Sequence, residues 1–417
     1  MRKKNKGAYG GDGLRIAMLG AGFIGWGGGI DFLEAYISPL RRLKDCEIYI
    51  FIPQEHRIQR FLREAWYWLR TAVFRKKTVR YSPPCTADEL REIFGDDDVH
   101  VVVCPVWRGM ASNIEPTLKK YHIDIVFPTI LNLGKGFSLP WIPYLPDLQH
   151  KYYPKFFSET EIKNCDVFFT DLLQSARSVI VEAQAVKDDL QKFYPVGDTK
   201  IFVMPYTAVP KKEWFFLDDV DIGKYHLPAK YFLISNQFWL HKDHRTAFEA
   251  LRLLHDAGYD EYHIVCTGKT EDHRDAEYFP RLLAWVRENG LEQYIHFLGY
   301  IPKIEQIKIL CQSQAAIQPT LFEGNPGGGI AYNAVAMGVP IILSDIPVNL
   351  EMQSPLALFF KKQDAASLKD VIIDLIVHRE KLPHYSTQEL LEQGNARLDK
   401  LALSVDKVLR YGLERKE

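Results

Sequence analysis

A carboxylate and a cluster of glycines lie together in one predicted strand–loop–helix segment. Residues 315–317 are an apolar run typical of a strand, Glu323 stands in the loop after it, and 330–337 is predicted to be helical. Gly324, Gly327, Gly328 and Gly329 fill the space between them. Glycines before a helix let backbone N–H groups approach an anion, and the helix amino terminus adds positive potential. Because a carboxylate suits sugar hydroxyls rather than phosphate, the segment predicts a nucleotide-sugar site.

A lysine stands in a comparable place after another predicted strand. Lys242 belongs to the sequence SNQFWLHKDH, residues 235–244, which follows the apolar run 231–235. A loop at the carboxyl end of a strand would direct Lys242 into a cleft, where it would neutralise a diphosphate as a point charge. The alternative is an ordinary solvated lysine.

A histidine occurs in a loop of the first half of the chain. His150 closes the sequence DLQH, which follows a stretch rich in proline and tryptophan. The pKa of histidine lies near neutrality, so His150 is a candidate general acid or base, or a contact to a second substrate. The alternative is a structural loop histidine.

The first predicted strand is followed by a glycine-rich loop. Residues 20–25, GAGFIG, match the dinucleotide fingerprint G-x-G-x-x-G. Two observations disfavour NAD: further glycines delay the helix to about Ile30, and the second strand ends in IPQ without an acidic residue for the ribose. We therefore interpret this segment as a glycine loop that closes over a ligand between domains, rather than an NAD site or a simple tight turn.

Short β-rich runs alternate with helical stretches in two series. The first series comprises 16–19, 48–52, 99–104, 123–127, 167–169, 179–181 and 201–203, and the second comprises 231–235, 263–267, 295–298, 315–318, 341–343 and 358–360. Continuous apolar strands between helices are typical of parallel sheets covered on both faces. The sequence thus predicts an α/β protein with two Rossmann-like, doubly wound domains that face a cleft.

The predicted boundaries follow from this alternation and from length, since 417 residues exceed one ordinary core. We expect a disordered tail over 1–13, an N-terminal domain over 14–210 and a C-terminal domain over 211–395. A final helix over 396–417 is expected to pack back on the N-terminal domain.

Composition excludes several classes of function. A net charge of −1 disfavours nucleic-acid binding, which needs a basic surface. The six cysteines are scattered without a C-x-x-C pair, which favours reduced thiols in a cytoplasmic protein. The basic amino terminus lacks the apolar core of a signal peptide, and no apolar run is long enough to span a bilayer. No metal site is predicted.

Residues 56–80 are strongly basic and amphipathic. At helical spacing the apolar residues of HRIQRFLREAWYWLRTAVFRKKTVR, two tryptophans among them, fill one half of the wheel and the arginines fill the other. This pattern predicts an element at the surface of an anionic membrane. The alternative is a crossover helix on the sheet with a solvated basic face.

Taken together, these motifs resemble the retaining family-4 glycosyltransferases of the GT-B fold, of the group 1 type. The resemblance rests on Asn236 with Lys242, on FLGY at 297–300, on Pro319 with FEG at 322–324, on Ala334 with GVP at 338–340, and on Ser344 with Asp345. The glycine loop after the first strand and the loop ending at His150 extend it over nearly the whole chain.

The resemblance implies a role for each matching residue. Lys242 would neutralise the donor diphosphate, Glu323 would lie close to the donor sugar, and His150 would lie near the reacting centre. The family's arginine is Asn236 here. Its second glutamate falls on Ala331, or on Asn333 if the extra glycines are an insertion. The expected donor-binding residues are Gly22, Gly25, Gly27, Asn236, Gly268, Tyr300, Gly324, Gly327, Gly328, Gly329 and Asn333.

The expected activity is transfer of a hexose, with retention, from a UDP- or GDP-sugar to a hydroxyl of a glycan or lipid-linked glycan in cell-surface polysaccharide synthesis. The nucleotide sugar is a co-substrate, and no other cofactor is expected. The chain would act in the cytoplasm, either free or at the inner face of the membrane. The alternatives are a non-catalytic nucleotide-sugar-binding or scaffolding protein of the same fold, and an NAD-dependent oxidoreductase.

Overall fold

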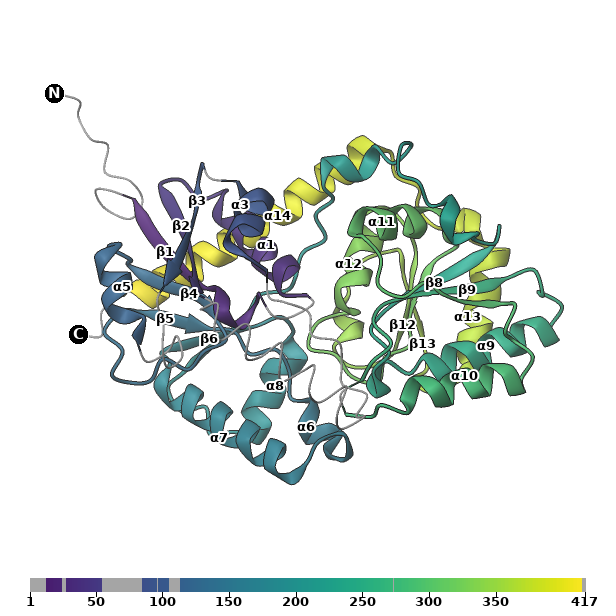
Figure 1. Cartoon of the computed structure of the whole chain (residues 1–417), viewed down its shortest axis with the longest axis horizontal. Helices are drawn as coiled ribbons and strands as arrows, with labels where there is room; N and C mark the ends of the chain where they lie inside the picture. Colours follow the sequence, from purple (N-terminus) through teal and green to yellow (C-terminus); the bar gives the residue numbers. More distant parts are fainter. Residues whose placement is uncertain are drawn as a thin grey trace, which may run out of the picture.

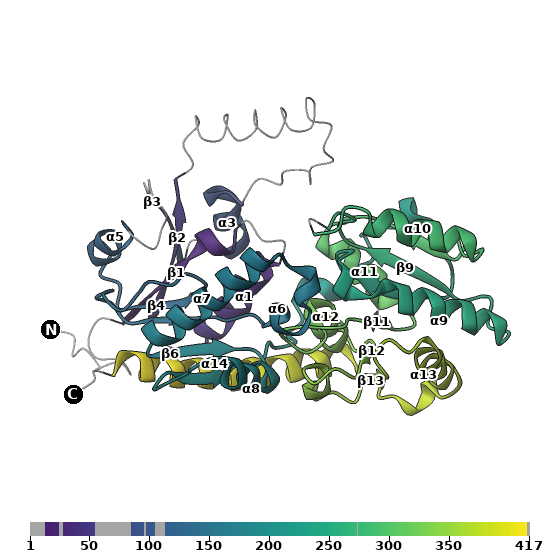
Figure 2. The ribbon, with the colours of Figure 1, turned by 90° about the horizontal axis from the view of Figure 1, so that it is seen from below.

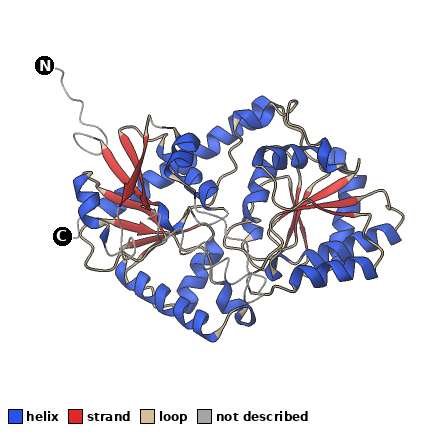
Figure 3. Cartoon of the chain, viewed as in Figure 1, coloured by secondary structure: helices blue, strands red, loops and turns tan. Residues whose placement is uncertain are grey.

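Two parallel β-sheets, one in each half of the chain, form the centres of two lobes (Figure 1, Figure 3). The computed structural model describes residues 13–24, 28–54, 85–95, 97–104, 113–272 and 274–414. Most of the predicted tail, the loop residues Gly25 and Gly27, and the basic segment 56–80 lie outside the described residues. The predicted α/β class with two doubly wound domains is confirmed.

The N-terminal sheet has the strand order β3-β2-β1-β4-β5, with every neighbouring pair parallel. A second, two-stranded sheet of β6 and β7 continues from it, because Tyr144 after β5 bridges to Ile180 of β6. The strands of these two sheets are β1 (Leu14–Leu19), β2 (Cys46–Pro53), β3 (Val99–Cys104), β4 (Ile125–Thr129), β5 (Trp141–Pro143), β6 (Ser178–Val181) and β7 (Lys200–Val203). Its helices are α1 (Gly29–Leu40), α3 (Ala87–Phe94), α5 (Glu115–Lys120), α6 (Gln149–Tyr152), α7 (Glu159–Ser175) and α8 (Gln184–Phe193).

The C-terminal sheet has the order β10-β9-β8-β11-β12-β13 and is also parallel throughout. Its strands are β8 (Tyr231–Ser235), β9 (His263–Thr267), β10 (Ile295–Phe297), β11 (Ala316–Gln318), β12 (Ile341–Ser344) and β13 (Ala357–Phe360). Its helices are α9 (His244–Asp256), α10 (Tyr278–Glu288), α11 (Lys303–Gln312), α12 (Gly328–Ala336) and α13 (Ala365–Val377). The order reverses between β8 and β11, and such a switch point is where doubly wound sheets bind ligands.

Hydrophobic burial on both faces explains why these strands are continuous apolar runs. All residues of β11 and β12 are buried, and separate apolar clusters cover the two faces of each sheet. A strand covered on both faces has no solvated side, so its sequence does not alternate.

One predicted strand is wrong, and one strand was not predicted. Residues 167–169 lie inside α7, where Phe169 is buried but Val167 is 52% exposed. Phe169, Leu172 and Leu173 are the buried residues of that helix, and their spacing is helical. The three-residue strand β5 was missed because its tryptophan and proline, with Pro140 directly before it, indicated a loop. Helix α1 begins at Gly29, as the glycine run predicts.

A single long helix joins the two lobes at the end of the chain. Helix α14 (Thr387–Leu413) begins with a Ser386 capping box and passes without interruption through the predicted boundary at 395. It runs back along the N-terminal lobe (Figure 1, Figure 2), where Leu401, Val405 and Leu409 join the core of that domain. The last helix therefore ties the two lobes together.

The contribution of α14 can be measured with two leucines of the same helix. Leu409 is fully buried, so Leu409→Ala should lower the free energy of unfolding by about 2–5 kcal/mol. Leu403 is 72% exposed, and Leu403→Ala should change it by less than about 0.5 kcal/mol. Urea unfolding followed by circular dichroism checks this, and equal effects of the two substitutions would contradict the packing.

Candidate functional site

Lys242 and Glu323 meet at the switch point of the C-terminal sheet. Lys242 ends a short turn after β8, and Glu323 lies in the loop that joins β11 to α12, residues 319–327. We call this segment the β11–α12 loop. Their side chains form an ion pair between Nζ and Oε1 and are only 12% and 11% exposed. Two residues that are 81 positions apart in the sequence thus form one charged centre.

The side-chain amides of Asn236 and Gln318 pair with each other next to this centre. Gln318, the last residue of β11, donates through Nε2 to Oε1 of Glu323 at 3.4 Å. The same Nε2 donates to Oδ1 of Asn236 at 3.1 Å, and Nδ2 of Asn236 donates back to Gln318. Asn236 is therefore engaged within the protein, where the family resemblance places an arginine directed at phosphate. Gln318 was not predicted as a site residue.

The backbone of the β11–α12 loop brings a helix terminus to Glu323. Gly327 has φ +66°, a left-handed conformation that glycine adopts without strain, and its N–H donates to Oδ1 of Asn349 at 2.8 Å. Helix α12 begins at the next residue, Gly328, where a Cβ would lie 3.9 Å from Oε1 of Glu323. The amino terminus of α12 therefore stabilises negative charge at this point, whether from a carboxylate or from a phosphate.

The N-terminal domain packs directly on the same loop. A Cβ at Gly324 would lie 2.0 Å from the carbonyl oxygen of Pro146 and 3.1 Å from Cβ of Asp147. Tyr153 donates through its hydroxyl to the carbonyl oxygen of Leu321 at 3.2 Å. Only glycine allows this approach, so Gly324 marks the point where the two domains meet.

Asp147 lies beside the charged centre, whereas His150 does not. Burial raises the pKa of the Asp147 carboxyl, Glu323 raises it further, and Lys242 opposes this rise. Sequence reasoning singled out the loop that contains Asp147 but named His150 as its candidate residue.

His150 packs among the helices of the N-terminal domain. Its Nε2 lies 2.8 Å from the hydroxyl of Tyr194 and 3.2 Å from Oδ1 of Asp166, and its ring stacks on Phe169. The side chain is 4% exposed, and burial lowers its pKa. These contacts direct the His150 side chain into the N-terminal domain, and its place near the reacting centre stays a prediction.

The other predicted donor-binding residues lie at the carboxyl edges of the two sheets. Gly268 follows β9, and its N–H donates to the carbonyl oxygen of Gly299 after β10 at 2.8 Å. Tyr300, in the same pair of loops, is 75% exposed. Gly22 ends the turn after β1 and packs on Ile130 after β4. Gly329, in the first turn of α12, is exposed.

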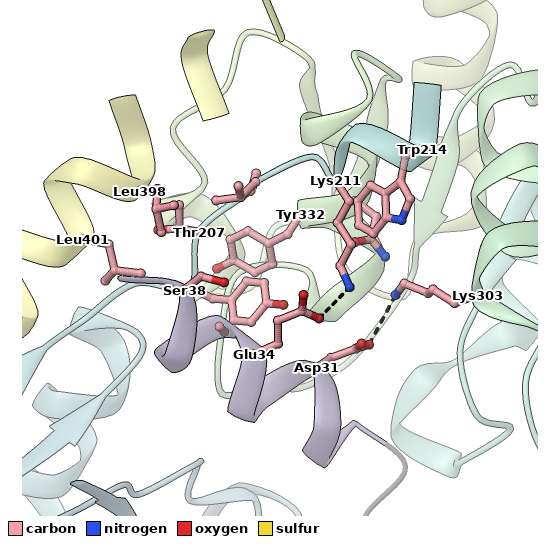
Figure 4. Close-up of a pocket in the computed structure, with 15 residues that line it drawn as sticks. Asp31, Glu34, Ser38, Thr207, Lys211, Trp214, Lys303, Tyr332, Leu398 and Leu401 are labelled. Atoms are coloured by element: carbon pink, nitrogen blue, oxygen red, sulfur yellow. Dashed lines mark hydrogen bonds and ion pairs between the residues drawn. The ribbon is translucent and has the colours of Figure 1, made fainter. Parts of the chain in front are cut away.

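Asn333 faces a cavity between the domains. This cavity of about 90 Å³ lies between α1, the segment 206–214, α12 and α14 (Figure 4). The ion pairs Lys211–Glu34 at 2.7 Å and Lys303–Asp31 at 3.3 Å cross it from one domain to the other. Ala331, the other candidate for the family's second glutamate, is fully buried. Of the two candidates, only Asn333 reaches a cavity.

Two further residues of the site escaped sequence reasoning. Asn325, within the β11–α12 loop, donates through Nδ2 to Oε2 of Glu182 at 2.7 Å. Glu182 follows β6 and is 1% exposed. A charged residue directly after a strand that is otherwise fully apolar was the available signal. Among the residues that the structure describes, no group of three or more His, Cys, Asp or Glu side chains could hold a metal ion.

Comparison with known families decides the class of this site. Residues 222–389 match the family described as "Glycosyl transferases group 1". We call the matched segment the group 1 domain; it covers less than half of the chain and lies within its C-terminal half. The group 1 domain therefore comprises the switch point, Lys242 and the whole β11–α12 loop. The family suspected from the motifs is confirmed.

A curated relative extends the similarity beyond the group 1 domain. The O-antigen chain mannosyltransferase RfbU of Salmonella typhimurium is 28% identical over 242 residues. The aligned region covers 57% of this chain and 60% of the length of RfbU.

Solved structures with the same fold cover nearly the whole chain. HepE of Anabaena, in complex with UDP and glucose, matches with a TM-score of 0.63 at 13% identity, over 95% of this chain and 99% of HepE. A sucrose-phosphate synthase from Thermosynechococcus elongatus gives 0.62 at 16% identity, over 95% and 98% of the two chains. A glycosyltransferase from Rickettsia africae gives 0.60 at 14% identity, over 97% and 100%. The predicted GT-B fold, with the group 1 domain as its second half, is confirmed.

The domain contact at Gly324 can be tested by adding one methyl group. Gly324→Ala would place Cβ against the carbonyl oxygen of Pro146 and force the β11–α12 loop away from the N-terminal domain. We expect a loss of about 1–3 kcal/mol of stability, as for other overpacked contacts, and a larger radius of gyration in solution scattering. Gly136→Ala is the control, because its Cβ would have nothing within 4 Å. Indistinguishable melting temperatures and scattering for the two variants would contradict this close approach.

Proposed function

We propose that this protein is a retaining glycosyltransferase that moves a hexose from a UDP- or GDP-sugar to a hydroxyl of a glycan or lipid-linked glycan. The observation that carries the proposal is the Lys242–Glu323 pair beside the amino terminus of α12, at the switch point of a group 1 domain. A cation and a helix terminus suit a diphosphate, and the adjacent carboxylate suits sugar hydroxyls.

Catalysis would be mainly electrostatic. Lys242 and the first backbone N–H groups of α12 would stabilise negative charge on the departing diphosphate without a metal ion. Glu323 would accept hydrogen bonds from the sugar and fix its orientation, which lowers the entropic part of the barrier. The leaving phosphate would take the proton of the acceptor hydroxyl on the face where the new bond forms, so that the configuration is retained. Packing of the N-terminal domain on Gly324 would exclude water from the transfer.

Asp147 takes the place that His150 held in the prediction. Asp147 belongs to the N-terminal domain, and a Cβ at Gly324 would lie 3.1 Å from its Cβ. From this place it would contact the acceptor hydroxyl or the transferred sugar. The ribose would be held by the amide of Asn333 rather than by a carboxylate.

The biosynthetic pathway in which the protein would act is inferred from its relatives. RfbU is an O-antigen chain mannosyltransferase, and HepE has been solved with UDP and glucose. These names support a nucleotide-sugar donor and a role in cell-surface polysaccharide synthesis. No helix among the described residues is long and apolar enough to cross a membrane.

The two charged residues give the sharpest test of activity. Lys242→Ala and Glu323→Gln should each lower kcat/KM by about 10²–10³-fold, because each removes a group that acts on the transition state. Lys230→Ala is the matched control, since Lys230 forms an ion pair with Glu261 at the opposite edge of the same sheet, with both side chains nearly half exposed. Release of UDP or GDP from a panel of nucleotide sugars, followed by chromatography, measures the rates. Variants as active as Lys230→Ala would refute the proposed centre.

A non-catalytic protein that binds nucleotide sugars is the second candidate. It is favoured by Asn236, whose side chain is engaged with Gln318, and by the burial of Ala331, because both depart from the family's donor contacts. A screen of thermal stability with UDP, GDP, ADP, NAD and their sugars separates the cases. Stabilisation by a nucleotide sugar without transfer or hydrolysis would establish the binding protein, and stabilisation by NAD alone would establish an oxidoreductase.

Association with a membrane is proposed from sequence alone, through residues 56–80. Neutralising four basic residues (Arg57, Arg60, Arg63 and Arg70→Gln) should abolish co-sedimentation with vesicles that contain anionic lipid, because each basic residue contributes about 1 kcal/mol at such a surface. Neutral vesicles are the control. Failure of the unsubstituted protein to bind anionic vesicles would remove the lipid-linked acceptor from the proposal.

A further inference from the structure

A buried carboxylate of the N-terminal domain holds the β11–α12 loop. Glu182 follows β6 directly, and its Oε2 accepts hydrogen bonds from Nδ2 of Asn325 at 2.7 Å and from the hydroxyl of Tyr144 at 3.2 Å. Asn325 lies two residues after Glu323 in the same loop. The Glu182–Asn325 hydrogen bond therefore connects the loop of the charged centre to the N-terminal domain.

The surroundings of Glu182 are apolar and rich in tyrosine. Tyr36 of α1, Tyr206 of the interdomain segment and Tyr332 of α12 lie close enough for Glu182 to raise the pKa of each hydroxyl, although burial is the largest cause in every case. Within the described residues, Oε1 of Glu182 and the hydroxyls of Tyr36 and Tyr332 are buried without a hydrogen-bond partner. No salt bridge to Glu182 occurs among these residues, so only the hydrogen bonds from Asn325 and Tyr144 would compensate a negative charge there.

We propose that Glu182 is a positioning residue that holds the β11–α12 loop, and with it Glu323, against the N-terminal domain through Asn325, and does so in its neutral, protonated form. The part of the proposal that concerns donor binding rests on the proposed function. The part that concerns the loop rests on the contacts alone.

Protonation follows from where the carboxyl group lies. Burial raises the pKa of Glu182 to about 7, although its hydrogen bonds from Asn325 and Tyr144 oppose this rise. When the domains separate, water reaches Glu182, and its pKa returns towards the ordinary value of about 4.3. Between these two values the closed form binds a proton that the open form lacks, so closure weakens as the pH rises through this window, up to about tenfold per pH unit. Below and above the window, closure is independent of the pH of the solution.

Amide hydrogen exchange of the full chain tests the hold on the loop without a substrate. Asn325→Ala and Glu182→Ala should each lower the protection factors of peptides that cover 319–329 by about tenfold at pH 5.5. Glu182→Gln keeps an acceptor for Asn325 and cannot ionise, so its protection at pH 5.5 should equal that of the parent or exceed it by up to about tenfold. Glu261→Gln, at an exposed ion pair remote from the loop, is the control and should change nothing there.

The pH profile distinguishes positioning from simple packing. Protection of the loop in the parent protein should fall about tenfold or more between pH 5.5 and 7.5, after correction for intrinsic exchange, and Glu182→Gln should show no such fall. A parallel fall in both proteins, or unchanged protection in Asn325→Ala, overturns the proposal. Asn325→Ala and Glu182→Gln keep the test decisive if Glu182→Ala does not fold.

Donor binding gives a separate result. In Asn325→Ala, the Kd for the nucleotide sugar that stabilises the parent most should rise about tenfold. If no nucleotide sugar binds but the exchange results hold, the proposed function fails and the role of Glu182 in positioning the loop stands.

Discussion

The β11–α12 loop is the constraint on which the rest of the structure depends. Within the C-terminal domain, Lys242 forms an ion pair with Glu323 of the loop, and Asn349 accepts a hydrogen bond from the N–H of Gly327 in the loop. From the N-terminal domain, Pro146 packs on Gly324 of the loop, and Glu182 accepts a hydrogen bond from Asn325 of the loop. Two domains thus hold one short segment from opposite sides. Because the charged centre belongs to that segment, its geometry depends on the relative position of the domains, and a rigid-body movement changes the chemistry of the site.

Charge is compensated differently on the two sides of this loop. Lys242 and Glu323 neutralise each other, so a diphosphate that binds here must compete with a carboxylate for the same ammonium group. Competition of this kind lowers affinity for free phosphate and favours a ligand that also brings hydroxyls to occupy Glu323. Glu182 pairs with no cation among the described residues, and in the proposed state it is neutral because it holds a proton. Under the proposals made above, the Lys242–Glu323 ion pair selects the ligand, and the neutral Glu182 fixes the loop that binds it.

Sequence reasoning reached the fold and the C-terminal half of the site but not the domain contact. Within the described residues, strand–helix alternation predicted twelve of the thirteen strands within about two residues, because buried parallel strands are continuous apolar runs. Lys242 and Glu323 were found because each follows a strand, and the carboxyl ends of parallel strands share one edge. Glu182, Asn325 and Asp147 act across the domain boundary, and no local pattern encodes which loops of two separate sheets will face each other. The contacts of His150 with Asp166 and Tyr194 could not be predicted from the sequence for the same reason.

The two halves of the chain contribute to the site in different ways. The family match is confined to residues 222–389, where the switch point, the ion pair and the start of α12 form a self-contained site for a phosphorylated ligand. A site for a common donor depends on local backbone geometry, and that geometry recurs wherever the fold does. The N-terminal domain contributes side chains such as Asp147, Tyr153 and Glu182, which depend on this particular pairing of loops. Under the proposed function, specificity for the acceptor would therefore reside in the N-terminal domain, because its side chains can vary without loss of the group 1 site.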